Sequence, residues 1–177
     1  LTMYNGVTVE VTNTDAEGRL ILGDALSYGV KTYKPKAIVD LATLTGGVIV
    51  ALGTQAAGCF CGDTDFRKQL FDAADFTGER LWHLPLWEEH KALIKGSHGD
   101  LVNSGGREAH AIQGAAFLSY FVGPDGAPAT GDPSKDPQWA HLDIAGVADT
   151  KKDSPLFPAG PTAFGVRLLV RLAEHWK

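Results

Sequence analysis

Residues 36–44, KAIVDLATL, followed by TGG at 45–47, decide the fold class. Apart from Asp40 and Thr43 the segment is apolar at odd and even positions alike, which is typical of a strand buried on both faces. A strand buried on both faces needs helices to cover them. The segment therefore predicts an α/β domain.

Strand and helix patterns alternate on both sides of this segment. Alternating residues at 8–12 and an apolar run at 139–144 predict further strands. Helical spacing or capping residues predict helices near 20–29, 63–78, 87–94, 111–122 and 164–176, the last with Val166, Leu169, Val170 and Leu172 on its apolar side. The order predicts an α/β fold: a three-layer sheet with helices on both faces, mainly parallel strands, and no internal repeat.

Composition narrows the class of protein. With 44% hydrophobic and 21% charged residues, the 177-residue chain resembles folded globular proteins. A net charge of -5 argues against broad binding to nucleic acid or to an anionic membrane, and no apolar run approaches the roughly 20 residues of a membrane helix.

Cys59 and Cys61 are expected to be buried thiols of a reducing cytosol. Because nothing resembling a native start precedes Leu1, we expect an upstream segment to be missing.

The segment NTDAEGR at 13–19 holds the side chains that are best suited to metal binding or catalysis. In extended geometry its side chains two apart, Asp15, Glu17 and Arg19, would share one face. The carboxylates offer hard oxygen ligands for one or two divalent cations, and the guanidinium fork suits a carboxylate, a carbonate or an oxyanion. Alternatively, Asp15 caps a helix, Glu17 lies in its first turn, and Arg19 is a solvated partner. Spacing alone does not decide between them.

Other catalytic motifs are missing from the sequence. The six histidines are scattered without an H-E-x-x-H pattern, and His141, within a predicted strand, is expected to be structural. There is no G-x-S-x-G motif and no G-x-x-x-x-G-K-[ST] loop. Serine hydrolases and P-loop NTPases therefore lose their main support.

Residues 13–20, NTDAEGRL, resemble the signature octapeptide of the leucine aminopeptidase (cytosol aminopeptidase) family. Four further segments also resemble blocks of that family: 40–46 (DLATLTG), 100–107 (DLVNSGGR), 141–146 (HLDIAG) and 160–167 (GPTAFGVR). The resemblance implies that residues 1–177 form the C-terminal portion of a metallo-aminopeptidase catalytic domain.

The resemblance also implies individual roles. Asp15 would ligate one metal ion, Glu17 would bridge both ions, and Arg19 would be the catalytic arginine that holds bicarbonate. The positions that would line the substrate pocket are Thr43, Leu44, Gly46 and Ala145. The reaction implied is hydrolysis of the N-terminal residue from a peptide by two divalent ions, Mn or Zn, with bicarbonate helping to deprotonate the attacking water.

In the family, the remaining ligands and a catalytic lysine lie upstream of the signature. This chain alone is therefore expected to be inactive, whereas the full-length protein is expected to be a cytoplasmic homo-hexamer acting on peptides. The alternative is a non-catalytic fragment or an oligomer-forming binding module that keeps the signature without turnover. The sequence leaves open which metal binds and which N-terminal residue is preferred.

Overall fold

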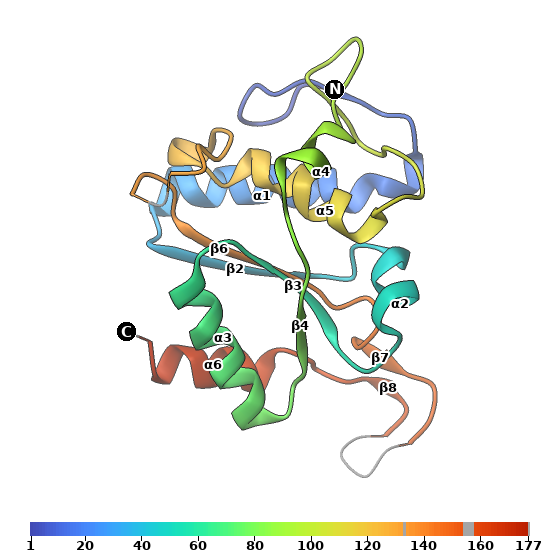
Figure 1. The fold of residues 1–177 in the computed structure, drawn as a ribbon, viewed down its shortest axis with the longest axis vertical. Helices are drawn as coiled ribbons and strands as arrows, with labels where there is room; N and C mark the ends of the chain where they lie inside the picture. Colours follow the sequence, from blue (N-terminus) through green and yellow to red (C-terminus); the bar gives the residue numbers. More distant parts are fainter. Residues whose placement is uncertain (133, 154–157, 177) are drawn as a thin grey trace. The chain divides into compact units, whose positions relative to one another are not determined.

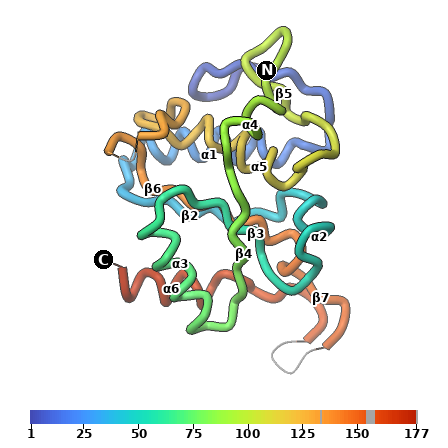
Figure 2. The backbone as a smooth tube through the Cα atoms, viewed as in Figure 1, coloured from blue at the N-terminus to red at the C-terminus, as the bar shows by residue number. Residues whose placement is uncertain are grey.

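The computed structural model describes residues 1–132, 134–153 and 158–176 (Figures 1 and 2). The chain divides into two compact units. Unit 1 comprises Leu1–Ile38 and Pro85–Trp139, and unit 2 comprises Val39–Leu84 and Ala140–Lys177. Each unit is therefore built from two stretches of chain that are far apart in the sequence.

Unit 1 carries a short parallel pair of strands that positions the NTDAEGR segment. Strand β1 (Val9–Glu10) pairs with β5 (Leu101–Val102), and Val9 lies opposite Leu101. The strand predicted at 8–12 is thus real but only two residues long. Because parallel strands end at the same edge, the chain after β1 and the chain after β5 emerge side by side.

Helix α1 (Glu17–Tyr33) follows the 3₁₀ helix η1 (Thr14–Ala16) and packs against α5 (His110–Leu118) and the 3₁₀ turns η2 (Ser119–Phe121) and η3 (Pro124–Gly126). Most apolar residues of α5, including Phe117 and Leu118, are buried, whereas Ile112 is half-buried. This segment forms part of the core of unit 1. Helix α4 (Glu88–Ala92) packs on α5 as well.

Unit 2 holds most of a four-stranded sheet with the order β2 (Ala37–Ala42), β6 (Gln138–Asp143), β3 (Ala57–Cys61), β4 (Leu81–His83). The pair β3–β4 is parallel and β3–β6 is antiparallel. Backbone bonds from Gln138 N to Lys36 O and from Ile144 N to Ala42 O, both 2.9 Å, run in the same sense along β6 and β2, which is a parallel pairing. The expected α/β class with mainly parallel strands is confirmed.

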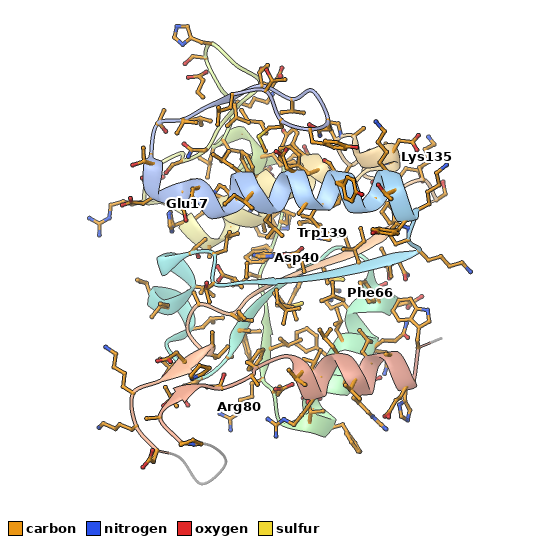
Figure 3. The ribbon with its side chains drawn as sticks, turned by 180° about the vertical axis from the view of Figure 1, so that it is seen from behind. Glu17, Asp40, Phe66, Arg80, Lys135 and Trp139 are labelled. Atoms are coloured by element: carbon orange, nitrogen blue, oxygen red, sulfur yellow. The ribbon has the colours of Figure 1, made fainter. Side chains whose placement is uncertain are left out.

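The two longer helices of unit 2 pack side by side (Figure 1). Asp63 accepts the N–H of Phe66 at 2.7 Å and begins α3 (Thr64–Thr77), as its capping residue predicts. Phe66, labelled in Figure 3, is fully buried, and its ring lies 5.3 Å from that of Trp176, beyond α6 (Val166–Glu174). A small antiparallel pair, β7 (Asp149–Thr150) and β8 (Gly160–Pro161), completes the unit.

Two predictions about burial are wrong. Within β2 only Asp40 is buried and the other residues are half-buried; among the strands that the structure describes, β2 lies at the edge of its sheet. In α6 the predicted Leu172 is buried and Leu169 is half-buried, but Val166 and Val170 are more than half exposed, and Leu168, which was not predicted, is buried. The helix faces the core with Leu168 and Leu172, so its buried apolar side is narrower than its sequence suggests.

Cys59 and Cys61 are free, buried thiols on β3, as the sequence predicts. Among the helices that the structure describes, none combines the length and the apolar character needed to cross a membrane.

Candidate active site

The NTDAEGR segment is helical, not extended. Asp15 lies in η1, and Glu17 is the first residue of α1 (Figure 3). The extended geometry from which the shared face was predicted is therefore wrong, whereas the placement of Glu17 in the first turn of a helix, which the alternative gave, is confirmed. Asp15 and Glu17 are exposed, while Arg19 is only 2% exposed.

The carboxylates of Asp15 and Glu17 are available to a ligand. Over the residues that the structure describes, neither carboxylate accepts a hydrogen bond or forms an ion pair. Asp15 does not cap a helix; instead the Oδ1 of Asn13 accepts the N–H of Asp15 at 2.9 Å and caps η1. Two exposed carboxylates without protein partners fit the hard oxygen donors that divalent cations prefer.

The side chain of Asn103 holds the backbone that carries these carboxylates. It is fully buried at the carboxyl end of β5. Its Oδ1 accepts the N–H groups of Thr12 at 2.9 Å and Asn13 at 3.2 Å, and its Nδ2 donates to Asn13 O at 2.6 Å and to Ala16 O at 3.5 Å. One side-chain amide thus pairs with backbone donors and acceptors on both sides of Asp15, in residues 12–16.

Arg19 is anchored at the same place. Its Nη1 donates to the backbone carbonyl oxygen of Asn103 at 2.8 Å. A buried guanidinium with this contact is not the solvated helix-end partner of the alternative interpretation. Arg19 therefore presents a fixed cation inside unit 1, next to the residue that orders the NTDAEGR segment.

The predicted pocket residues gather at the ends of two strands in unit 2. Thr43 and Leu44 connect β2 to α2 (Gly46–Leu52), a helix that the sequence did not predict, and Gly46 is the first residue of that helix. Ala145 follows β6. The Oδ1 of Asp143 accepts the N–H of Leu44 at 3.1 Å and the N–H of Ala145 at 3.3 Å. The structure thus brings Leu44 and Ala145, about a hundred residues apart in sequence, onto one carboxylate.

A buried histidine–carboxyl contact lies in the same sheet. His141 Nδ1 is 2.5 Å from the Oδ1 of Asp40, which Figure 3 labels on β2, and both side chains are buried. The His141 ring stacks on Phe60 with centroids 5.8 Å apart. These packing contacts agree with the expected structural role of His141.

Sequence reasoning assigned no role to Asn103 or Asp143, although both lie in segments that resemble the family. Local sequence gives one signal of a role for these residues: each is a polar residue at the end of a buried strand. Both side chains contact segments that lie 87 to 99 residues away in the sequence. In the part of the chain that the structure describes, no group of three or more His, Cys, Asp or Glu side chains is arranged to hold a metal ion.

Sequence comparison identifies close relatives of the chain. The catalytic-domain model of the cytosol aminopeptidase family matches residues 1–170. A probable cytosol aminopeptidase of Chloroherpeton thalassium is 48% identical over all of this chain and 32% of its own length. One of Desulfovibrio desulfuricans is 48% identical over 96% of this chain and 32% of its own length. The chain spans about a third of the length of these relatives.

Solved structures give the same result. A mutant of tomato leucine aminopeptidase superposes with a TM-score of 0.82 at 39% identity, over 95% of this chain and 30% of that one. The bottromycin maturation enzyme BotP superposes with a TM-score of 0.85 at 33% identity, over 97% of this chain and 36% of that one. BotP in complex with Mn gives 0.83 at 34% identity, with the same coverage. The chain therefore belongs to the cytosol aminopeptidase family, within the catalytic domain.

Proposed function

We propose that this chain is the C-terminal part of the catalytic domain of a metal-dependent aminopeptidase, which removes N-terminal residues from peptides. The observation that carries the proposal is the pair of exposed carboxylates, Asp15 and Glu17, on a backbone ordered by Asn103 and followed by the buried Arg19. Family membership supports the same reaction class.

Asp15 and Glu17 would hold two divalent ions, with Glu17 bridging both. When bound, such ions polarise a carbonyl and lower the pKa of a bound water. Manganese is the first choice because the related BotP has been solved with Mn, and zinc is the second. Two carboxylates are fewer ligands than a dinuclear site needs, so further ligands would come from the rest of a longer protein.

Arg19 would hold bicarbonate, which supplies a base for the water proton. A planar guanidinium with several donors suits a planar oxyanion, and its contact with Asn103 O fixes its orientation. Thr43, Leu44, Gly46 and Ala145 would line the pocket for the N-terminal residue of the peptide. Thr43 and Gly46 are exposed and the other two are half-buried, so a peptide can reach them.

The test uses the full-length protein and a panel of aminoacyl-amide substrates. Turnover should vanish after exhaustive chelation and return when Mn or Zn is added. Turnover that persists in protein shown by elemental analysis to be metal-free would contradict the proposal. The 177-residue chain, assayed in parallel, should be inactive because it supplies too few ligands.

The alternative, a non-catalytic fragment or binding module, predicts no turnover by the full-length protein with any metal. We further propose that the full-length protein is a cytoplasmic homo-hexamer. Sedimentation velocity at micromolar concentration should give the mass of six subunits, and a monomeric species would contradict the assembly without affecting the proposed reaction.

A further inference from the structure

The carboxylate of Asp143 connects the two segments of the proposed pocket, residues 43–46 and Ala145. Besides its hydrogen bonds to Leu44 and Ala145 it contacts Thr45. Its Oδ1 also lies 3.5 Å from the N–H of Thr45, and its Oδ2 accepts the hydroxyl of Thr45 at 2.7 Å. Asp143 is fully buried. Three backbone N–H groups and one hydroxyl therefore satisfy the two oxygens of this buried carboxyl group.

The hydroxyl of Thr45 extends this network into α2. Thr45 is buried, and its Oγ1 accepts the N–H of Val48 at 3.2 Å, which caps the helix. The hydroxyl of Thr45 therefore accepts a hydrogen bond from α2 and donates one to Asp143 at the same time. The start of α2 and the end of β6 are tied through one side chain on each.

The backbones of the two segments also approach each other closely. A Cβ atom placed on Gly146 would collide with the carbonyl oxygen of Gly53, the residue that ends α2. Gly146 is buried, whereas the neighbouring Ala145 is half-buried. Beneath the pocket residues, the polar contacts of Asp143 and the glycine contact leave the two segments little freedom to shift.

From this arrangement we propose that Asp143 is a positioning residue that sets the separation of Leu44 and Ala145 and thereby the preference of the enzyme for the N-terminal side chain. The inference rests on the proposed function. Asp143 itself is buried beneath the pocket and acts through the backbone of its two partners. Its loss changes the shape of the pocket and leaves the metal ligands, which lie on another segment, in place.

The test compares Asp143→Asn and Asp143→Ala with Glu79→Gln in the full-length enzyme. Glu79 is a matched control because it is also a buried carboxylate that accepts two backbone N–H groups, those of Gly165 at 3.1 Å and Leu168 at 2.7 Å. Those bonds hold the start of α6, away from the pocket segments in sequence. Asp143→Asn keeps an oxygen for the N–H groups and stays informative where Asp143→Ala does not fold.

For Asp143→Asn we expect KM to rise by about tenfold or more, because the loss of one or more hydrogen bonds to a buried group has effects of this size. kcat should change less, and the order of preference among small and large N-terminal residues should change. Metal content should match the wild type. Glu79→Gln should lower the Tm but keep the KM and the order of preference.

An Asp143→Asn enzyme with the wild-type KM and order of preference would overturn the proposal. So would a uniform loss of kcat that matches the control, since that would reflect stability alone. Hydrogen exchange in the same proteins separates this inference from the proposed function. An inactive wild type would contradict the function, while unchanged exchange of the Leu44 and Ala145 amides in Asp143→Asn would contradict the positioning role.

Discussion

The guanidinium of Arg19 donates from Nη1 to the backbone carbonyl oxygen of Asn103 at 2.8 Å, while the side-chain amide of Asn103 binds the chain just before Arg19. Asn103 therefore holds both the proposed bicarbonate-binding group and the segment of Asp15. The parallel pairing of β1 and β5 makes this possible, because it brings the ends of both strands to one edge.

Changing Asn103 to Ala should weaken metal binding as well as stability. It removes the partner of part-buried backbone groups of Thr12 and Asn13, which water can replace in part, so each lost bond should cost less than the roughly 1–3 kcal/mol of a fully buried unsatisfied group. Thermal unfolding and a metal titration of the full-length protein measure the two effects. Asn5→Ala is the control, since Asn5 donates to Tyr120 O at 2.9 Å in the same unit, and it should lose stability without losing metal affinity.

Changing Arg19 to Ala should slow turnover while the metals remain bound. Removing one preorganised charged group beside a reaction centre costs about 2.7 to 4 kcal/mol, or roughly a hundred- to thousandfold in rate. Arg19→Lys keeps the charge but not the fork, so bicarbonate should rescue it only partly. Turnover and metal content, measured together, check this. Near-normal turnover in Arg19→Ala would rule out the assigned role.

Helices whose ends carry capping residues could be predicted from the local sequence. Helix α3 begins after Asp63 and ends before Gly78, as its capping residues indicate. Helix α2 was missed because it is short, begins with two glycines and is otherwise apolar, a pattern that does not separate a helix from a strand. For the NTDAEGR segment the sequence left an extended and a helical form open, because D-x-E-x-R spacing suits a strand while Glu17 also suits the first turn of a helix, where the structure places it.

The proposed site was only partly predictable for a different reason. The candidate ligands came from resemblance to a family signature, and spacing alone left them undecided. The contacts of Asn103 and Asp143 depend on which strands pair, and pairing of distant strands has no local sequence signal. Likewise, β2 lies at the edge of its sheet among the described strands, and its apolar residues are less buried than their pattern predicts.

Changing Glu17 to Gln should lower metal content and turnover together. The change keeps the shape of the side chain but removes the charge proposed to bridge both ions. Asp65→Asn is the matched control, because Asp65 is another exposed acid in the first turn of a helix. If Glu17 only complements the helix dipole, both variants should lose about 0.3–1 kcal/mol of stability and leave metal content unchanged.

The two cysteines should be unreactive in the folded protein and should make its stability fall at alkaline pH. Burial raises the pKa of Cys59 and Cys61 from 9.0 to about 12. At pH 8 a thiol reagent should therefore modify them only after unfolding, because the thiolate is the reactive form.

The direction of the pH effect follows from the protons bound in each state. Between about pH 9 and 12 the unfolded chain loses its thiol protons while the folded chain keeps them, so the free energy of unfolding falls as the pH rises. Denaturant unfolding of the full-length protein at a series of pH values measures the slope. The double variant Cys59→Ala/Cys61→Ala should show a shallower decline over this range, and an unchanged slope would mean that other groups cause it.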